Sequence, residues 1–305
     1  MGSERLAGAL SIAVSATSFG AMAIFARHAY GSGADVVSVL FLRFLIAAVL
    51  MSGVMLATGR HWPSGRNLAI LAAMGGIGYV GQSFSFFSAL NHASAGLVAL
   101  LLYLYPFLVT ILGALVLGEK LTRLRLAAVL IALAGTAVTI GGGIHGQPLG
   151  VVLGVSAALI YSIYILVGSR VMREEAPLGA ATVVMIAAAV VFGGLIGFTG
   201  AAWPQTADGW AAVVSIAVVS TVVAMVSFFV GMQKLGAADA ATLSTLEPVV
   251  TFVLAAVFLG EVIRPNHVVG GAMILGAVVW LTRSGSRAPA NGTAPRGATS
   301  STRTG

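Results

Sequence analysis

Residues 85–119 of this chain read SFFSALNHASAGLVALLLYLYPFLVTILGALVLGE. Residues 227–261 read SFFVGMQKLGAADAATLSTLEPVVTFVLAAVFLGE, at an offset of 142 positions. Both stretches open on Ser-Phe-Phe, carry a central proline (Pro106 or Pro248) and close on Leu-Gly-Glu. Because these motifs share one ungapped register, they indicate that the chain contains an internal duplication.

The same offset extends outward from these stretches, since Gly8 aligns with Gly150 and Ala16 with Ala158. We therefore expect a first repeat over residues 6–143 and a second over 149–283. Three short segments complete the chain: an N-terminal segment at 1–5, a linker at 144–148 and a tail at 284–305. The tail is rich in Ser, Gly, Thr, Ala, Pro and Arg, a composition that predicts disorder.

Each repeat consists of apolar runs of about 20 residues, the length that crosses the hydrocarbon layer of a bilayer. Hydrophobic residues make up 58% of the chain and charged residues only 8%, too few charges to cover a water-soluble surface. We predict an all-α membrane protein with ten transmembrane helices formed by two inverted five-helix repeats. The predicted spans are 6–26, 35–58, 67–90, 94–117, 124–143, 149–171, 177–199, 210–232, 240–260 and 266–283.

The basic residues predict the orientation of these spans, because cytoplasmic loops hold an excess of Lys and Arg. With both termini in the cytoplasm, thirteen of the sixteen basic residues lie on inner segments. Outer loops then hold only Arg27 and Arg264, and Arg43 lies within the second span. Since each repeat has an odd number of spans, the second repeat enters the membrane from the opposite face. Such halves can open a central site to each side in turn, although duplication could also serve only to enlarge the bundle.

Several other classes of protein are disfavoured by what the sequence lacks. The absence of cysteine excludes disulfides, thiolate metal sites and a cysteine nucleophile. The five histidines are scattered, and no phosphate-binding glycine loop, zinc spacing or Ser-His-Asp arrangement occurs. We therefore predict no enzyme activity, no cofactor and no metal. The net charge of +7 does not predict nucleic-acid binding, because the basic residues form no stripe with interleaved aromatic residues.

These features resemble those of the drug/metabolite transporter superfamily, specifically its EamA-type members, over residues 6–283. The resemblance rests on a first helix rich in Gly and Ser, on Leu42-Arg43-Phe44, on the proline-centred fourth helix that ends in Leu-Gly-Glu, and on a Gly-containing fifth helix. The second repeat departs from this pattern, because Met185 stands where Arg43 would recur.

The resemblance implies a multi-pass secondary transporter of the bacterial inner membrane, in the group that includes YddG-type proteins. Such a protein would export small metabolites, above all amino acids, by alternating access. A carrier of drugs, nucleosides or lipid precursors with the same fold is the nearest alternative. A channel or receptor is a more distant one, because a pore in a monomer would need a ring of similar groups.

Two ionisable residues lie within predicted spans, where charge is costly and commonly functional. Glu247 precedes Pro248, whose missing N–H leaves a backbone carbonyl without its usual partner. We expect Glu247 to contact a substrate amino group or to exchange a proton, unless it serves only in helix packing. Arg43 could pair with Glu247, cap a broken helix or reach toward water.

The remaining site candidates are polar or aromatic. Tyr79, Gln82 and Ser83 follow the helical spacing of one stripe, which suits a cavity wall or close helix packing. The predicted substrate site consists of Tyr79, Gln82, Ser83, Tyr103, Tyr161, Tyr164, Ser244 and Glu247, and the predicted hinges are Gly75, Gly78, Gly81, Pro106 and Pro248. The Gly-Glu pairs at 118–119 and 260–261 are expected at helix ends, with the charge in water and no role in transport. Expected partners are a small-molecule substrate, the lipid bilayer and candidate coupling protons, while the sequence does not decide the oligomeric state.

Overall fold

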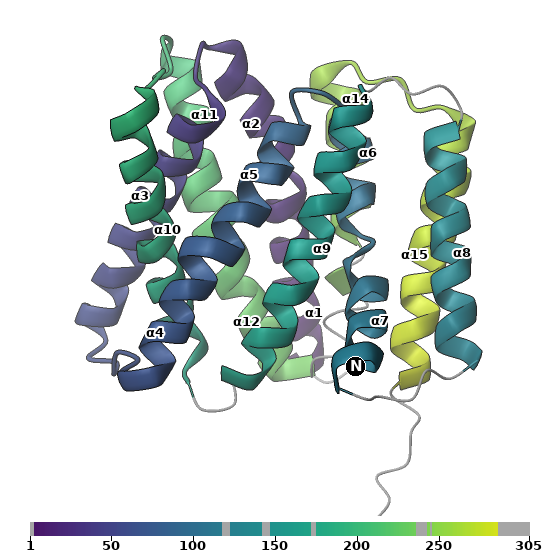
Figure 1. The fold of residues 1–305 in the computed structure, drawn as a ribbon, viewed down its shortest axis with the longest axis horizontal. Helices are drawn as coiled ribbons and strands as arrows, with labels where there is room; N and C mark the ends of the chain where they lie inside the picture. The colour runs from purple at the N-terminus through teal and green to yellow at the C-terminus, as the bar shows by residue number, and fades with distance from the viewer. Residues whose placement is uncertain are drawn as a thin grey trace, which may run out of the picture.

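A computed structural model describes residues 3–117, 123–141, 147–171, 175–235, 243–244 and 246–285. Helices dominate these ranges, and no residue within them lies in a β-strand (Figure 1). The first half contains α1 (Ser3–Gly20), α2 (Met22–Gly31), α3 (Val36–Ala57), α4 (Gly65–Ala73), η1 (Met74–Tyr79), α5 (Val80–Ala89), α6 (Ala95–Leu102), α7 (Tyr105–Leu117) and α8 (Arg123–Gly141). The second half contains α9 (Pro148–Val171), α10 (Pro177–Thr199), α11 (Ala207–Ala217), η2 (Val218–Val223), α12 (Ala224–Leu235), α14 (Leu246–Leu259) and α15 (Pro265–Gly285).

Six helical segments of the described chain are long and apolar enough to cross a membrane. They are Leu6–Gly31, Val36–Ala57, Gly65–Ala89, Pro148–Gly168, Leu178–Thr199 and Ala207–Phe228. Shorter apolar helices cover Ala95–Val109, Leu126–Gly135 and Leu246–Leu259. Large apolar side chains on the outside of the bundle, such as Phe198 with 91% of its surface exposed, suit contact with lipid. The chain is therefore an all-helical, multi-pass membrane protein.

The first span is longer than predicted and includes Arg27. The sequence suggested an end near residue 26 and an outer-loop position for this arginine, but α2 continues to Gly31. Nη2 of Arg27 donates a hydrogen bond of 2.7 Å to the carbonyl oxygen of Ala93. The charged group therefore has a partner although Arg27 lies within the helix. The prediction was wrong here because it ended the apolar run at the first charged residue.

The predicted fourth span is not a continuous helix. It divides into α6 and α7, which are separated by Tyr103 and Leu104. Pro106 is the second residue of α7, where its missing N–H costs nothing, but a helix running through it would lose a bond to the carbonyl of Leu102. Pro248 is likewise the third residue of α14. The break therefore lies just before the proline, and residues 240–242 of the predicted ninth span lie outside the described ranges.

Two helices contain a stretch of wider π-helix, η1 between α4 and α5 and η2 between α11 and α12. The first stretch contains two of the predicted hinge glycines, Gly75 and Gly78. Gly75 packs closely on α10, since a Cβ atom there would lie 2.5 Å from the carbonyl oxygen of Val184. The sequence of η2 contains no glycine, so glycine alone does not explain the wider helix.

Matching glycine contacts occur in the two halves. A Cβ atom on Gly8 of α1 would lie 2.9 Å from Cβ of Lys234 at the end of α12. A Cβ atom on Gly150 of α9 would lie 2.9 Å from the carbonyl carbon of His92, just after α5. Both residues of the second contact are related to those of the first by the 142-residue offset. The two halves therefore pack their equivalent helices through equivalent glycines.

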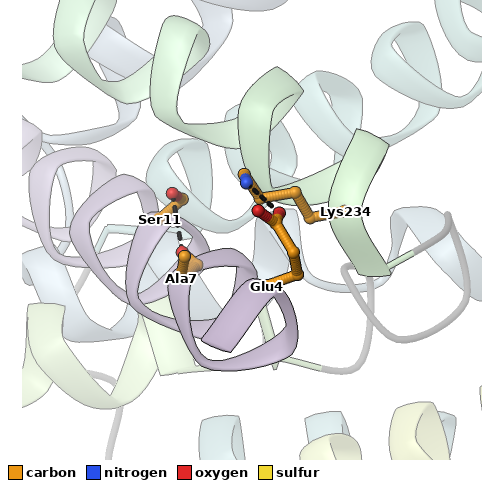
Figure 2. Close-up of polar contacts among 4 residues, drawn as sticks. All are labelled: Glu4, Ala7, Ser11 and Lys234. Carbon is orange, nitrogen blue, oxygen red and sulfur yellow. Dashed lines mark hydrogen bonds and ion pairs between the residues drawn. The ribbon is translucent and has the colours of Figure 1, made fainter. Parts of the chain in front are cut away.

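A polar contact accompanies each of these glycines, at opposite ends of the bundle. Glu4 and Lys234 form an ion pair between α1 and α12 (Figure 2). Nδ1 of His92 lies 2.9 Å from Oε1 of Gln147, between the end of α5 and the start of α9. In Figure 1, α1 lies in the lower part of the bundle, whereas the connection from α5 to α6 lies at the upper end. This arrangement is what an inverted repeat requires.

Candidate functional site

Five of the six tyrosines border one cavity of about 270 Å³ between the two halves. They come from η1 (Tyr79), from the break between α6 and α7 (Tyr103), from the first residue of α7 (Tyr105) and from α9 (Tyr161 and Tyr164). Neighbouring rings touch, with centroids 5.0 Å apart for Tyr105 and Tyr161 and 5.5 Å apart for Tyr79 and Tyr164. Other residues at this cavity are Ser15, Ala16, Phe19, Ala181, Met185, Met225, Phe228, Ser244 and Glu247.

A second cavity of about 100 Å³ adjoins the first, because six residues border both. It adds the polar side chains of Arg43, Gln82 and Ser83 to the site. The structure thus brings all eight predicted substrate residues, together with Arg43, to one place. Tyr105 also borders both cavities, although it was not among those eight.

Glu247 lies in the first turn of α14, with its carboxyl group beside Tyr103. The Tyr103 hydroxyl lies 3.0 Å from Oε2 of Glu247 and 2.6 Å from the carbonyl oxygen of Ser244. The hydroxyl of Thr251, one turn further along α14, lies 3.0 Å from the carbonyl oxygen of Gly20 and 3.1 Å from that of Glu247, so these two acceptors share its proton. These bonds fasten the start of α14 to α1 and to the break after α6.

Arg43 is almost completely buried, with 2% of its surface exposed, on the inward face of α3. Its Nε donates a 3.0 Å hydrogen bond to Oγ1 of Thr221, and its Nη2 donates a 3.3 Å bond to the hydroxyl of Tyr79. The guanidinium carbon also lies 4.9 Å from the ring centre of Phe44. Of the expected roles, an ion pair with Glu247 is therefore not what the structure shows, since the hydrogen bonds of Arg43 go to two hydroxyls.

The two hydroxyls that hold Arg43 come from equivalent positions of the repeats. Tyr79 ends η1, Thr221 lies in η2, and the 142-residue offset relates them. Thr221 also donates a 2.9 Å bond to the carbonyl oxygen of Ile216, five residues back, as a π-turn would. Sequence reasoning missed Thr221 because, apart from Ser220, its neighbours in the chain are apolar, yet the repeat register pairs it with Tyr79.

The predicted hinge glycines Gly78 and Gly81 pack closely against α9, and their role as hinges stays a prediction. Cβ atoms on Gly78 and Gly81 would lie 3.3 Å from Tyr164 and 3.6 Å from Ile160, so both glycines face α9. This placement agrees with close packing, the alternative that the sequence left open for this stripe. Within the described ranges, no three histidine or acidic side chains gather where they could hold a metal ion.

The second Gly-Glu pair differs from its prediction. Gly260, with φ of +65°, ends α14 as expected for a helix-terminating glycine. Glu261, however, accepts hydrogen bonds from the backbone N–H groups of Ala95 and Gly96 at 2.7 and 3.3 Å. Its charge is therefore engaged by α6 and not simply surrounded by water. The first pair, Gly118-Glu119, lies outside the described ranges.

Comparison with known proteins identifies the family. A sequence model described as the EamA-like transporter family matches the chain twice, over residues 6–141 and 148–283. This chain belongs to the EamA-like transporter family. The resemblance predicted from the repeat motifs is thereby confirmed, and transport, not catalysis, is the activity of this family.

Several curated transporters are similar to this EamA-family chain. The aromatic amino acid exporter YddG of Ancylobacter novellus is 30% identical over 68% of this chain and 72% of its own length. A probable terminal-alkyne amino-acid exporter of Streptantibioticus cattleyicolor is 27% identical over 79% of this chain and 82% of its own. The uncharacterized transporter YcbK of Bacillus subtilis is 28% identical over 88% of this chain and 90% of its own length. A crystal structure with 23% identity has the same fold, with a TM-score of 0.65 over 92% of this chain and 98% of that chain.

Proposed function

We propose that this transporter exports small metabolites, above all amino acids, across the bacterial inner membrane by alternating access. Ten transmembrane helices in two inverted repeats would form it, with both termini in the cytoplasm. The observation that carries the proposal is the composition of the central site. One acid, one base and five tyrosine rings border two adjoining cavities, and polar groups within a membrane protein commonly mark a substrate pathway.

This composition matches the three parts of an amino acid. Glu247 offers a carboxylate to the ammonium group, and Arg43 offers a guanidinium to the carboxylate, which it can bind through two hydrogen bonds. The tyrosine rings offer an apolar but polarisable wall for the side chain. A volume of about 270 Å³ lies just below the usual range for ligand pockets, which suits one small molecule.

Two similar proteins support this choice of substrate. Their printed names describe exporters of amino acids, one of them aromatic, at 27% and 30% identity. The chain spans most of the length of both relatives. A drug or a nucleoside remains the competing cargo, because aromatic cavities accept many flat ligands.

The hydrogen bonds of Tyr103 support a role for protons in the transport cycle. Its hydroxyl has one proton but lies within bonding distance of both the Ser244 carbonyl and the Glu247 carboxyl. A carbonyl oxygen only accepts, so the shorter contact of 2.6 Å takes the phenolic proton. The contact with Glu247 is then satisfied when the carboxyl group itself carries a proton. We infer that an incoming ammonium group displaces this proton, which would couple export to proton exchange.

Counterflow into liposomes tests the substrate. Purified protein would be supplied with a panel of labelled amino acids, nucleosides and cationic drugs. We expect saturable uptake of at least one amino acid. If nucleosides or drugs are taken up and no amino acid is, the proposed cargo is wrong.

A pH gradient across the same liposomes tests the role of Glu247. Glu247→Gln keeps the shape of the side chain but cannot exchange a proton, so we expect uptake to lose its dependence on the gradient. Glu175→Gln is the matched control, since Glu175 lies between α9 and α10 and accepts a bond from Asn67, away from both cavities. Unchanged pH dependence in Glu247→Gln would exclude this residue as the proton carrier.

A further inference from the structure

Glu261 lies at the end of α14, next to a polar hollow and away from the substrate cavities. The hollow has a volume of about 550 Å³ and is bordered by Glu261, Arg27 and the loop between α5 and α6. None of its lining residues borders either of the two tyrosine-lined cavities. Any influence of Glu261 on the substrate must therefore pass through another part of the protein.

We propose that Glu261 is a positioning residue for the substrate site. Its carboxylate holds the first turn of α6, and α6 in turn holds Tyr103 against Glu247. This role rests on the proposed function, because the geometry that Glu261 sets is that of the proposed substrate site. The carboxylate comes from the second repeat and the helix that it holds comes from the first.

The contact is a helix cap made by a distant acid. Oε1 and Oε2 of Glu261 accept bonds from the N–H groups of Ala95 and Gly96, while Oγ of Ser94 accepts one from Leu97 at 3.3 Å. N–H groups in a first helical turn have no partner within the helix, and the dipole there favours negative charge. Glu261 thus supplies both missing acceptors and a favourable charge at the start of α6.

The backbone just before α6 is held from the opposite side. Arg27 on α2 donates a 2.7 Å bond to the carbonyl oxygen of Ala93. A cation therefore binds the carbonyl side of this short segment and an anion binds its N–H side. Together they fix the start of α6 between α2 and the end of α14.

A short helix connects this position to the cavity. α6 has eight residues and is about 12 Å long, with Glu261 bound at its first turn and Tyr103 directly after its last residue. Gly96 lies against the ring of Phe252 on α14 so closely that a Cβ atom there would be 2.5 Å from the ring. At the far end, the Tyr103 hydroxyl meets Glu247. Contacts with α14 thus fix both ends of α6, and a shift at one end moves the other.

Hydrogen exchange on the full-length protein in lipid nanodiscs tests the cap without any substrate. Glu261→Ala is expected to speed exchange of the α6 amides about fivefold, the change that corresponds to the typical cost of losing a helix cap. Glu261→Gln keeps one acceptor oxygen and should give a smaller increase. Asp208→Ala removes an exposed acid from the first turn of α11 and serves as the control. Equal exchange in Glu261→Ala and the control would overturn the proposal.

Transport of labelled L-phenylalanine tests whether the effect reaches Tyr103. Residues about 12 Å apart usually contribute independently, so non-additive effects would report coupling through α6. We expect Glu261→Ala to raise KM about fivefold with a smaller change in kcat, and to add little once Tyr103→Phe is present. Additive changes in KM would show that Glu261 does not act through Tyr103.

Failure of transport and failure of the variant to fold lead to different conclusions. If the unmodified protein does not transport L-phenylalanine or any other amino acid, the proposed function fails, while hydrogen exchange still decides whether Glu261 holds α6. If Glu261→Ala does not fold, Ser94→Ala removes the other side-chain acceptor in the same turn. It should then speed α6 exchange and raise KM in the same direction, and no change in either would contradict the proposal.

Discussion

Replacing Thr221 by Val removes a single hydroxyl from the junction between Arg43 and η2. Thr221 is fully buried, accepts the Nε–H of Arg43 and donates to the carbonyl oxygen of Ile216. Val has nearly the same shape, so the substitution deletes these two bonds with little change in packing. The guanidinium then has a buried N–H without an acceptor.

The expected cost follows from these two bonds. A buried donor on a charged group loses about 1.5–3 kcal/mol when its acceptor is removed. Hydrogen bonds between helices in a membrane average about 0.6 kcal/mol, and we take this average as the upper limit for the second bond, which lies within a single helix. Burial of a methyl group in place of a hydroxyl offsets about 1 kcal/mol of this loss. We therefore expect Thr221→Val to lower the free energy of unfolding by about 2 kcal/mol.

Thr182→Val is the matched control. Thr182 is also fully buried, but its hydroxyl donates only to the carbonyl oxygen of Leu178 within α10. Loss of this bond costs about 0.5 kcal/mol, which the same burial of a methyl group offsets, so Thr182→Val should be neutral or slightly stabilising. Equilibrium unfolding in mixed micelles, with added dodecyl sulfate as denaturant, measures both variants. If the two variants differ by less than about 0.5 kcal/mol, the bond from Arg43 to Thr221 does not hold this junction together, and the reasoning fails.

Three further predictions concern contacts within the helix bundle, and thermal unfolding of the purified protein tests each of them. Gly75→Ala should destabilise by about 1–3 kcal/mol because its Cβ atom meets backbone atoms of α10, whereas Gly53→Ala, with open space around it, should be neutral or stabilising; equal melting points would contradict the close approach. Gly150→Ala should cost more than Gly8→Ala, because the first meets backbone atoms and the second meets side chains that can move, and the reverse order would be inconsistent with these contacts. Lys234→Met should cost less than about 1 kcal/mol, since its ion pair at the membrane surface is exposed, and a larger loss would indicate a role beyond this pair.

Much of the fold follows from the sequence because the bilayer imposes a simple rule on it. Apolar runs of the right length form helices, since a backbone in lipid must satisfy its own hydrogen bonds. The same rule explains why the predicted site residues meet. Tyrosines, an acid and a base within apolar helices avoid lipid by facing the interior, and the interior of a single bundle is shared.

The details that the sequence did not reveal depend on contacts between distant segments. Arg27 stays in α2 because a carbonyl 66 residues away accepts its hydrogen bond, and no local pattern records that partner. Glu261 was expected in water because the N–H groups that bind it belong to the other half of the chain. The repeat register could have exposed Thr221 as the equivalent of Tyr79, had the apolar character of its neighbours not hidden it.

The wider turns of η1 and η2 have a mechanical consequence. A π-turn accommodates one residue more than an α-turn, and each residue of an α-helix is rotated by about 100° from the one before. If the wide turn moves by one position along the chain, the side chain that it passes rotates about the helix axis, while the helix keeps its length and its hydrogen bonds. Tyr79 lies at the end of η1 and Thr221 lies inside η2. Such a shift of the wide turn would therefore break or re-form their hydrogen bonds to Arg43. A shift of this kind in either half would turn the wall of the cavity with no break in the helix.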